Sequence, residues 1–317
     1  MASIAYHASH EQFSPSRLLQ LVQQAEEAGF QAIHSSDHFH PWSERQGNSG
    51  YAFSWIGAAM QATQLPFSMV CAPGQRYHPA IVAQAIATIA EMFPNRFSIE
   101  LGSGEALNEV ITGTGWPEKQ VRNERLKECY DIIKRLLSGE EVSHNGHVQV
   151  NNARLYSLPE SIPPLFGAAI SEETAQWLGS WADGMITTAG TPDDVKQKMN
   201  KFHEDAGHQK PVYIKFSFSY HPDKNKALSG VHDQWRTLFL GREELADLRT
   251  VAEFDRATEQ VTLEDMREKA ELFTSMQQLK EAINRYAELG VDRIVLHNLN
   301  RDQDRFLADI ARSGILK

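Results

Sequence analysis

The chain has 317 residues, of which 41% are hydrophobic and 23% charged, and its formal net charge at pH 7 is -10. This balance is typical of a globular protein with a sizeable core. The acidic excess argues against a nucleic-acid partner, because binding phosphates needs clustered Lys and Arg. We expect a soluble protein with no membrane span. Cys71 and Cys129 form no CxxC pair, which favours a reducing cytoplasmic location.

The first regular element expected along the chain is a helix over residues 15–28. Ser14 precedes it as an N-cap and Gly29 ends it, as helix ends prefer. A strand is expected directly afterwards, over residues 30–33. The same helix, glycine and strand return near the other end, where a strand is expected over residues 291–297. Each unit is half of a βαβ step.

Strands and helices alternate between these two units. The expected strands cover residues 67–71, 97–101, 165–170, 184–188 and 212–220, and the expected helices cover residues 79–92, 117–137 and 172–181. This alternation has no Pro/Gly/Ser-rich linker, so it implies a parallel sheet with helices outside. We therefore predict a single α/β domain over residues 1–317, an eightfold (β/α)8 TIM barrel.

Two segments are too polar and charged to be barrel steps. Residues 140–160 and 221–270 are therefore predicted insertions: a small hairpin around Asn145 and Gly146, and a helical excursion over the barrel mouth. An open doubly wound sheet is the alternative fold. Its dinucleotide-binding fingerprint is absent, because Leu107 stands where the third glycine would be.

A group of ionisable and aromatic side chains follows the strand that begins at residue 30. Asp37, His38, His40 and Trp42 share one loop, and strand-end loops of α/β enzymes meet at one face. His38 can act as a base near neutral pH, while Asp37 can fix its tautomer or accept a cofactor hydrogen bond. A metal site with His34 is one alternative, although no HExxH-type helix supports it. An N-cap aspartate with hydrogen-bonded loop histidines is the other.

A second group follows the strand over residues 97–101. Ser103 and Gly104 lie where the backbone can approach a planar or anionic ligand, and Glu105 and Asn108 open a helix. Taken alone, this corner is equally consistent with a tight βα turn whose glutamate favours the helix N-terminus. Combined with the first group, it favours a ligand site.

These two groups resemble the luciferase-like flavin oxidoreductase superfamily, most closely the branch that contains deazaflavin (coenzyme F420)-dependent glucose-6-phosphate dehydrogenase. The runs that carry the likeness are residues 11–13, 36–42, 76–80, 94–96 and 102–109, and His297 with residues 302–307. The likeness therefore spans nearly the full chain. It implies a β/α barrel with insertions, a cofactor in the mouth at the C-terminal ends of the strands, and a homodimer.

The resemblance also implies a role for individual side chains. His38 would take a proton from the substrate hydroxyl, Trp42 would shield the reacting centre, and Glu105 would exchange a proton near the reduced ring. Glu11 stands where the family has a glutamate, and we include it among the catalytic candidates. The implied cofactor positions are Asp37, Met69, Val70, Ser103, Gly104, Glu105, Asn108, Ala168, Ala169, Ile170, Ser171 and Thr188.

The chain departs from the family at the positions that would bind a sugar phosphate. Thr191 stands in place of one lysine, and Lys269 is a loose match for a second. Asp292 falls on the family arginine, unless a one-residue shift restores Arg293. Each charge-assisted contact contributes about 1.5–3 kcal/mol, so these losses would weaken a phosphate clamp. We therefore predict that glucose 6-phosphate is not the substrate.

The cofactor is expected to be FMN or the deazaflavin F420. Ile170 and Ser171 replace a glycine pair of the deazaflavin branch, and Glu172 and Glu173 are unfavourable beside a phosphate. These changes favour FMN by a small margin. The chain is expected to be an oxidoreductase that moves hydride between its cofactor and a small organic substrate. An FMN-dependent monooxygenase and a non-catalytic flavin-binding protein are the alternatives.

Overall fold

The computed structural model describes residues 2–317, and its centre is a closed barrel of eight parallel strands. The barrel strands are β1 (Ser3–Ala8), β2 (Ala32–Ser36), β3 (Phe67–Cys71), β4 (Phe97–Leu101), β7 (Leu165–Ala168), β8 (Met185–Thr188), β9 (Val212–Tyr220) and β11 (Arg293–Asn298). The sheet closes because β8 pairs with β9, β9 with β11 and β11 with β1, all in parallel. This confirms the predicted TIM barrel and rules out the open sheet.

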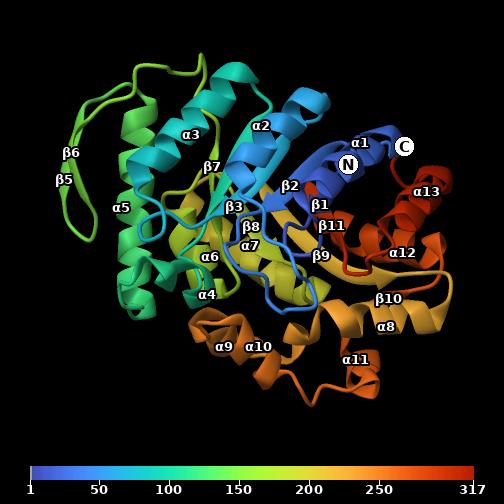
Figure 1. Cartoon of the computed structure of the whole chain (residues 1–317). Coiled ribbons are helices and arrows are strands. Elements are labelled where there is room, and N and C mark those ends of the chain that lie inside the picture. The colour runs from blue at the N-terminus through green and yellow to red at the C-terminus, as the bar shows by residue number, and fades with distance from the viewer. Residues whose placement is uncertain (1) are drawn as a thin grey trace.

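Eight helices connect or follow these strands. They lie on the outside of the barrel (Figure 1). They are α1 (Pro15–Ala28), α2 (Ala52–Ala62), α3 (Pro79–Met92), α5 (Lys119–Leu137), α6 (Glu172–Gly179), α7 (Pro192–Ala206), α12 (Met276–Ala287) and α13 (Gln303–Ser313). In α1 the Ser14 hydroxyl accepts a hydrogen bond from the Arg17 amide, and Gly29 takes a φ of 99° that favours glycine. Leu18, Leu21 and other apolar residues of α1 face the barrel.

Strand register separates the two sides of the barrel wall. On β9, Ile214 and Phe216 belong to the apolar layer between strands and helices, so Lys215 points into the barrel. Its register partner Val295 packs inside with Ala5 and Ala32.

Much of the rest of the barrel interior is unusually polar, although Phe166 and Ile186 also face inward. The inward-facing polar residues include His7, His34, Ser68, Ser98, Glu100, Lys215, Ser217 and His297. Barrel interiors are normally filled by Val, Ile and Leu. This departure places titratable groups directly beneath the site.

The segments outside the barrel pattern form a hairpin and a group of helices. The hairpin consists of β5 (Val142–Asn145) and β6 (Gln149–Ala153), which pair antiparallel and stand out beyond α5 (Figure 1). Residues 221–270 form α8 (Lys224–Gln234), η2 (Arg236–Phe239), α9 (Arg242–Asp247), α10 (Val251–Ala257) and α11 (Leu263–Lys269). Helices α9, α10 and α11 gather at one end of the barrel (Figure 1). A two-residue strand, β10 (Leu272–Phe273), then pairs with the end of β9.

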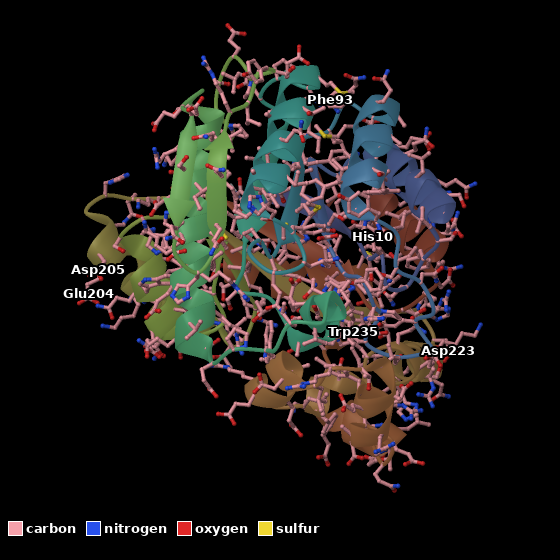
Figure 2. All side chains as sticks on the ribbon, turned by 60° about the vertical axis from the view of Figure 1, so that its left-hand side comes forward. His10, Phe93, Glu204, Asp205, Asp223 and Trp235 are labelled. Atoms are coloured by element: carbon pink, nitrogen blue, oxygen red, sulfur yellow. The ribbon has the colours of Figure 1, made fainter. Side chains whose placement is uncertain are left out.

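Contacts show which end of the barrel these helices cover. Phe254 of α10 packs against Trp42, which follows β2, and Trp235 packs against His297 at the end of β11. Figure 2 shows Trp235 where the helices of residues 221–270 meet the barrel. The helices therefore lie over the C-terminal ends of the strands. Among residues 2–317, no helix is long and apolar enough to span a membrane.

Candidate active site

The side chains of Glu11 and His38 form a pair at the barrel mouth. Glu11 follows β1 and His38 follows β2, and Glu11 Oε1 lies 3.4 Å from His38 Nε2. The hydroxyls of Ser9 and Ser36 each donate a hydrogen bond of 2.8 Å to Glu11. Burial would raise the pKa of Glu11, but the charges of His38 and Lys215 and the donated hydrogen bonds lower it to about 2. Glu11 is therefore ionised at neutral pH.

Asn108 sets the orientation of the His38 ring. Asn108 lies in the short helix α4 (Ala106–Glu109), and its Oδ1 accepts hydrogen bonds from the Phe39 and His40 amides at 2.9 and 3.1 Å. This fixes its Nδ2 as the donor to His38 Nδ1 at 3.2 Å. The neutral imidazole then carries its proton on Nε2, facing Glu11. The two groups are close enough for their titrations to be coupled.

Glu105 lies on the other side of Asn108. Its Oε2 is 3.4 Å from Asn108 Nδ2, so one amide contacts both His38 and Glu105. Burial raises the pKa of Glu105, although His38 opposes this. Glu105 therefore holds a proton more readily than an exposed glutamate, as a general acid requires. The preceding Gly104 has a φ of 83°, and a Cβ there would lie 3.0 Å from the Glu109 side chain.

Asp37 does not orient His38, contrary to one role considered for it. Its carboxylate accepts hydrogen bonds from Arg76 at 2.8 Å and from the Tyr77 hydroxyl at 3.2 Å. Arg76 also binds Glu109, since its amide lies 2.8 Å from that carboxylate. Arg76 and Tyr77 received no role in the sequence analysis. The sequence feature that could have indicated a role for them is their place in the run over residues 76–80, which matches the family.

Trp42 packs between the proposed base and the covering helices. Its ring centroid lies 5.2 Å from that of His38 and 5.1 Å from that of Phe254, which it meets nearly edge-on at 80°. The Trp42 amide donates to Gln46 Oε1 at 2.8 Å. Trp42 is thus held from both sides, where it can shield the space above His38.

The expected cofactor positions divide into two groups. Val70, Ser103, Ala168 and Thr188 are at least partly exposed at the ends of four neighbouring strands, and Ile170 is 48% exposed just beyond β7. Small residues and exposed apolar side chains next to Glu105 suit a flat aromatic ring system.

Three other expected cofactor positions have different surroundings. The side chains of Met69 and Ala169 lie in the buried apolar cluster, so only their backbone could face a cofactor. Strand alternation turns the Met69 side chain of β3 away from the mouth. The Ser171 hydroxyl caps α6 by accepting from the Thr174 amide. Glu172 and Glu173, which follow it, are exposed.

The cation positions of a phosphate clamp are not assembled. Thr191 caps α7 by accepting from the Asp194 amide, and the exposed Lys269 lies 4.5 Å above the Phe239 ring. A buried lysine missed from the sequence, Lys198, is near Thr191, but it forms an ion pair with Asp194 at 2.9 Å.

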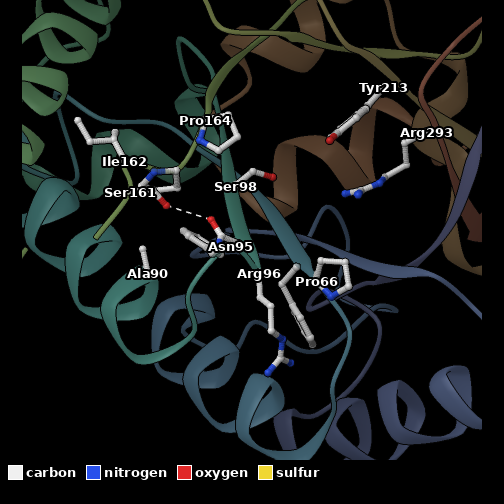
Figure 3. Close-up of a pocket in the computed structure, with 13 residues that line it drawn as sticks. Pro66, Ala90, Asn95, Arg96, Ser98, Ser161, Ile162, Pro164, Tyr213 and Arg293 are labelled. Carbon is white, nitrogen blue, oxygen red and sulfur yellow. Dashed lines mark hydrogen bonds between the residues drawn. The ribbon is translucent and has the colours of Figure 1, made fainter. Parts of the chain in front are cut away.

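Neither candidate arginine position belongs to the mouth. Arg293 begins β11 and Asp292 directly precedes it, where Asp292 accepts from the Val212 amide at 2.8 Å. Arg293 lines a pocket at the N-terminal end of the barrel with Tyr213 and Ser98 (Figure 3). A one-residue shift therefore restores no clamp. The pocket of Figure 3 is remote from Glu11 and His38, so we place the chemistry at the other end.

The histidines of the alternative metal site point to different partners. His34 Nδ1 lies 2.8 Å from His7 Nδ1 inside the barrel, whereas His40 Nδ1 contacts the Leu107 carbonyl at 2.9 Å. Across residues 2–317, no group of three or more His, Cys, Asp or Glu is arranged to hold a metal ion.

Comparisons with known proteins identify related sequences over the whole chain. The F420-dependent glucose-6-phosphate dehydrogenase of Microbacterium testaceum is 35% identical and aligns with 95% of this chain and 93% of its own. The enzyme of that name from Mycobacterium tuberculosis is 32% identical, with 96% and 94% coverage. These relatives do not support the small preference for FMN. Glu172 and Glu173, which were part of the basis for that preference, are exposed.

Solved structures of F420-dependent enzymes are also similar to this chain. An F420-dependent secondary alcohol dehydrogenase in complex with an F420-acetone adduct superposes with a TM-score of 0.91 at 28% identity, covering 100% of this chain and 99% of that one. The F420-dependent tetrahydromethanopterin reductase of Methanopyrus kandleri, at 18% identity and a TM-score of 0.76 with 98% of both chains covered, shares the fold. The family described as luciferase-like monooxygenase matches residues 2–293. The chain is an oxidoreductase of this luciferase-like family.

Proposed function

We propose that the protein is an F420-dependent dehydrogenase that oxidises a secondary alcohol carrying no phosphate group. The observation that carries this proposal is the Glu11–His38 pair, 3.4 Å apart beside Trp42 and linked through Asn108 to Glu105. Such a set offers a base for a carbinol oxygen and an acid for a second site. The relatives named for F420 support the cofactor.

The residues at the mouth fit a deazaflavin ring. Ser103, Gly104 and Ala168 leave room for a planar group, and Val70 and Ile170 offer apolar contact. When bound, F420 supplies a ring carbon that accepts hydride.

Proton handling is assigned to the chain's own side chains. The Glu11–His38 pair takes the carbinol proton at the ionised Glu11 carboxylate, because His38 Nε2 already carries a proton and Nδ1 accepts from Asn108. Glu105 gives a proton to the ring nitrogen, because burial keeps this carboxyl protonated more readily. Trp42 positions the carbinol carbon and excludes water between these groups.

The substrate is proposed from what the mouth lacks. A phosphate needs several cations within hydrogen-bond reach, and each such contact contributes about 1.5–3 kcal/mol. Here Thr191 is neutral, Lys198 is paired with Asp194, and Arg293 lies at the opposite end of the barrel. An unphosphorylated alcohol matches this arrangement. The solved relative with acetone bound to F420 supports it.

Assembly and location are proposed from the family likeness. We expect a homodimer, and light scattering of the purified protein would report its mass. A cytoplasmic location agrees with two buried, unpaired cysteines among the described residues.

Cofactor titration of the purified protein tests the proposal. We expect F420 to quench Trp42 fluorescence with an affinity at least tenfold above that for FMN. Trp42→Phe is the matched control, because the quenching should fall while binding measured by equilibrium dialysis persists. The His38→Ala variant should still bind F420 and should lose alcohol-driven reduction of it. Tighter binding of FMN, or loss of F420 binding on His38→Ala, would contradict the assignment.

A further inference from the structure

The proposed reaction leaves two side chains in the wrong protonation state after every turnover. The carbinol loses hydride to the ring and a proton to the Glu11–His38 pair, while Glu105 gives its proton to the ring nitrogen. The substrate thus loses one proton and the ring gains one, so the two together have no net change in protons. The pair ends with one proton too many and Glu105 with one too few. Before the next cycle the pair must release one proton and Glu105 must regain one, and a single group between them can serve both needs.

Lys215 lies in the space beneath both groups. It points into the barrel from β9, level with Thr188 of β8 and Val295 of β11. Its charge helps to lower the pKa of Glu11 and acts against the raised pKa of Glu105. Another cationic side chain near the mouth, Arg76, forms ion pairs with Asp37 and Glu109 instead.

The immediate surroundings of Lys215 suit proton exchange. Within residues 2–317 it forms no hydrogen bond or ion pair, and it is half-buried. The other titratable groups facing it are His7 from β1, His34 from β2 and His297 from β11, and burial lowers the pKa of all three, so they are neutral. Burial also lowers the pKa of Lys215 itself. Its flexible four-carbon side chain interacts electrostatically with both the Glu11 and the Glu105 carboxyl groups.

We propose that Lys215 returns the proton from the Glu11–His38 pair to Glu105 after each hydride transfer, an inference that rests on the proposed function. The Lys215 ammonium gives a proton to the Glu105 carboxylate and becomes a neutral amine. The amine then takes the proton held by the pair, which regenerates the ammonium and the ionised Glu11. No oxidant or further reactant is needed. Lys215 acts through these groups and touches neither hydride donor nor acceptor.

Replacing Lys215 by arginine separates proton transfer from charge. A guanidinium keeps the positive charge but does not release its proton. Rapid mixing of the F420-loaded enzyme with 2-propanol measures the first reduction, and multiple turnover measures the cycle. For Lys215→Arg we expect a first reduction within about twofold of wild type and a steady-state rate at least tenfold lower. Lys210→Met is the control, because Lys210 binds the Gly179 and Ala182 carbonyls away from the mouth.

A second variant guards against a misfit of the larger arginine side chain. In Lys215→Met, methylamine should raise the steady-state rate in proportion to its concentration, because a free amine can carry the proton. A wild-type steady-state rate in Lys215→Arg, an equal fall in both phases, or no rescue of Lys215→Met would overturn the proposal. If the wild type shows no first reduction with any alcohol, the proposed function itself fails.

Discussion

The ring of Phe254 packs nearly edge-on against that of Trp42, with centroids 5.1 Å apart. Phe254 belongs to α10, outside the barrel pattern, whereas Trp42 follows β2 and contacts His38 on its other side. A fully buried side chain of the covering helices thus fixes one wall of the active site. The stability of the loop that carries His38 and Trp42 is therefore coupled to that of the helices of residues 221–270.

Truncating Phe254 should loosen this wall. Phe→Ala substitutions at buried sites cost about 3–5 kcal/mol, so Phe254→Ala should lower the melting temperature. It should also raise KM for the alcohol, because Trp42 loses its support. Phe254→Leu keeps most of the volume and is the matched control. Thermal melts and steady-state kinetics on the two variants check this, and equal KM values in both would contradict it.

Glu11 should influence both catalysis and acid stability. Its pKa is lowered to about 2 in the folded state, so it stabilises the fold above its unfolded pKa, and this contribution is lost as pH falls toward 2. Glu11→Gln should therefore reduce the steepness of acid unfolding and lower the rate of F420 reduction by about 10²–10⁴-fold. Urea unfolding at pH 3 and pH 7 measures the first effect. An unchanged reduction rate would contradict the role of the pair.

The contribution of Glu100 to folding stability should depend on pH in the opposite sense to that of Glu11. Burial raises its pKa to about 8, so the folded state holds this proton more tightly than the unfolded chain does. Its contribution is therefore favourable at low pH and is lost as pH rises through about 8. Glu100→Gln should stabilise the protein by about 2–4 kcal/mol above pH 8, with a smaller effect at pH 5. Denaturant melts at both pH values test this, and a uniform effect would disprove it.

Much of the fold and part of the site could be predicted from residues alone. The helix before Gly29 and the strand after it have clear local signals, and the matching runs brought Glu11, His38, Trp42 and Glu105 to one mouth. Lys215 could not be predicted as a site residue. The side of a strand to which a single lysine points is known only when the pairing of that strand with its neighbours is known.

Two other differences have similar causes. Met69 fits a strand equally well on either face, and only the register turns it into the apolar layer. Arg76 is separated from Asp37 by almost forty positions, so no local pattern shows their ion pair. Contacts set by strand order are therefore the part that sequence reasoning could not reach.

A cation placed at position 191 should give the mouth some affinity for phosphate. Thr191→Lys should lower the inhibition constant of glucose 6-phosphate by about tenfold, because one charge-assisted contact contributes about 1.5–3 kcal/mol. Thr191→Ala is the matched control, since both variants lose the hydrogen bond that caps α7. Equal inhibition constants in the two variants would show that position 191 does not face the substrate.

Breaking the Arg76 ion pairs should destabilise the mouth. Arg76→Met leaves Asp37 and Glu109 buried without their cation, which costs about 3–5 kcal/mol. The melting temperature should fall by several degrees, and Asp37→Asn should soften the loss because it removes one unpaired charge. Calorimetry on the single and double variants measures this coupling. Strictly additive losses would show that the two residues act independently.

The most direct test of the account is anaerobic stopped-flow reduction of enzyme-bound F420 by 2-propanol and, separately, by glucose 6-phosphate. The signal is the loss of visible absorbance of the oxidised deazaflavin. We predict rapid reduction by the secondary alcohol, none with His38→Ala, and a rate at least a hundredfold lower with the sugar phosphate. Faster reduction by glucose 6-phosphate than by any simple secondary alcohol would contradict the account.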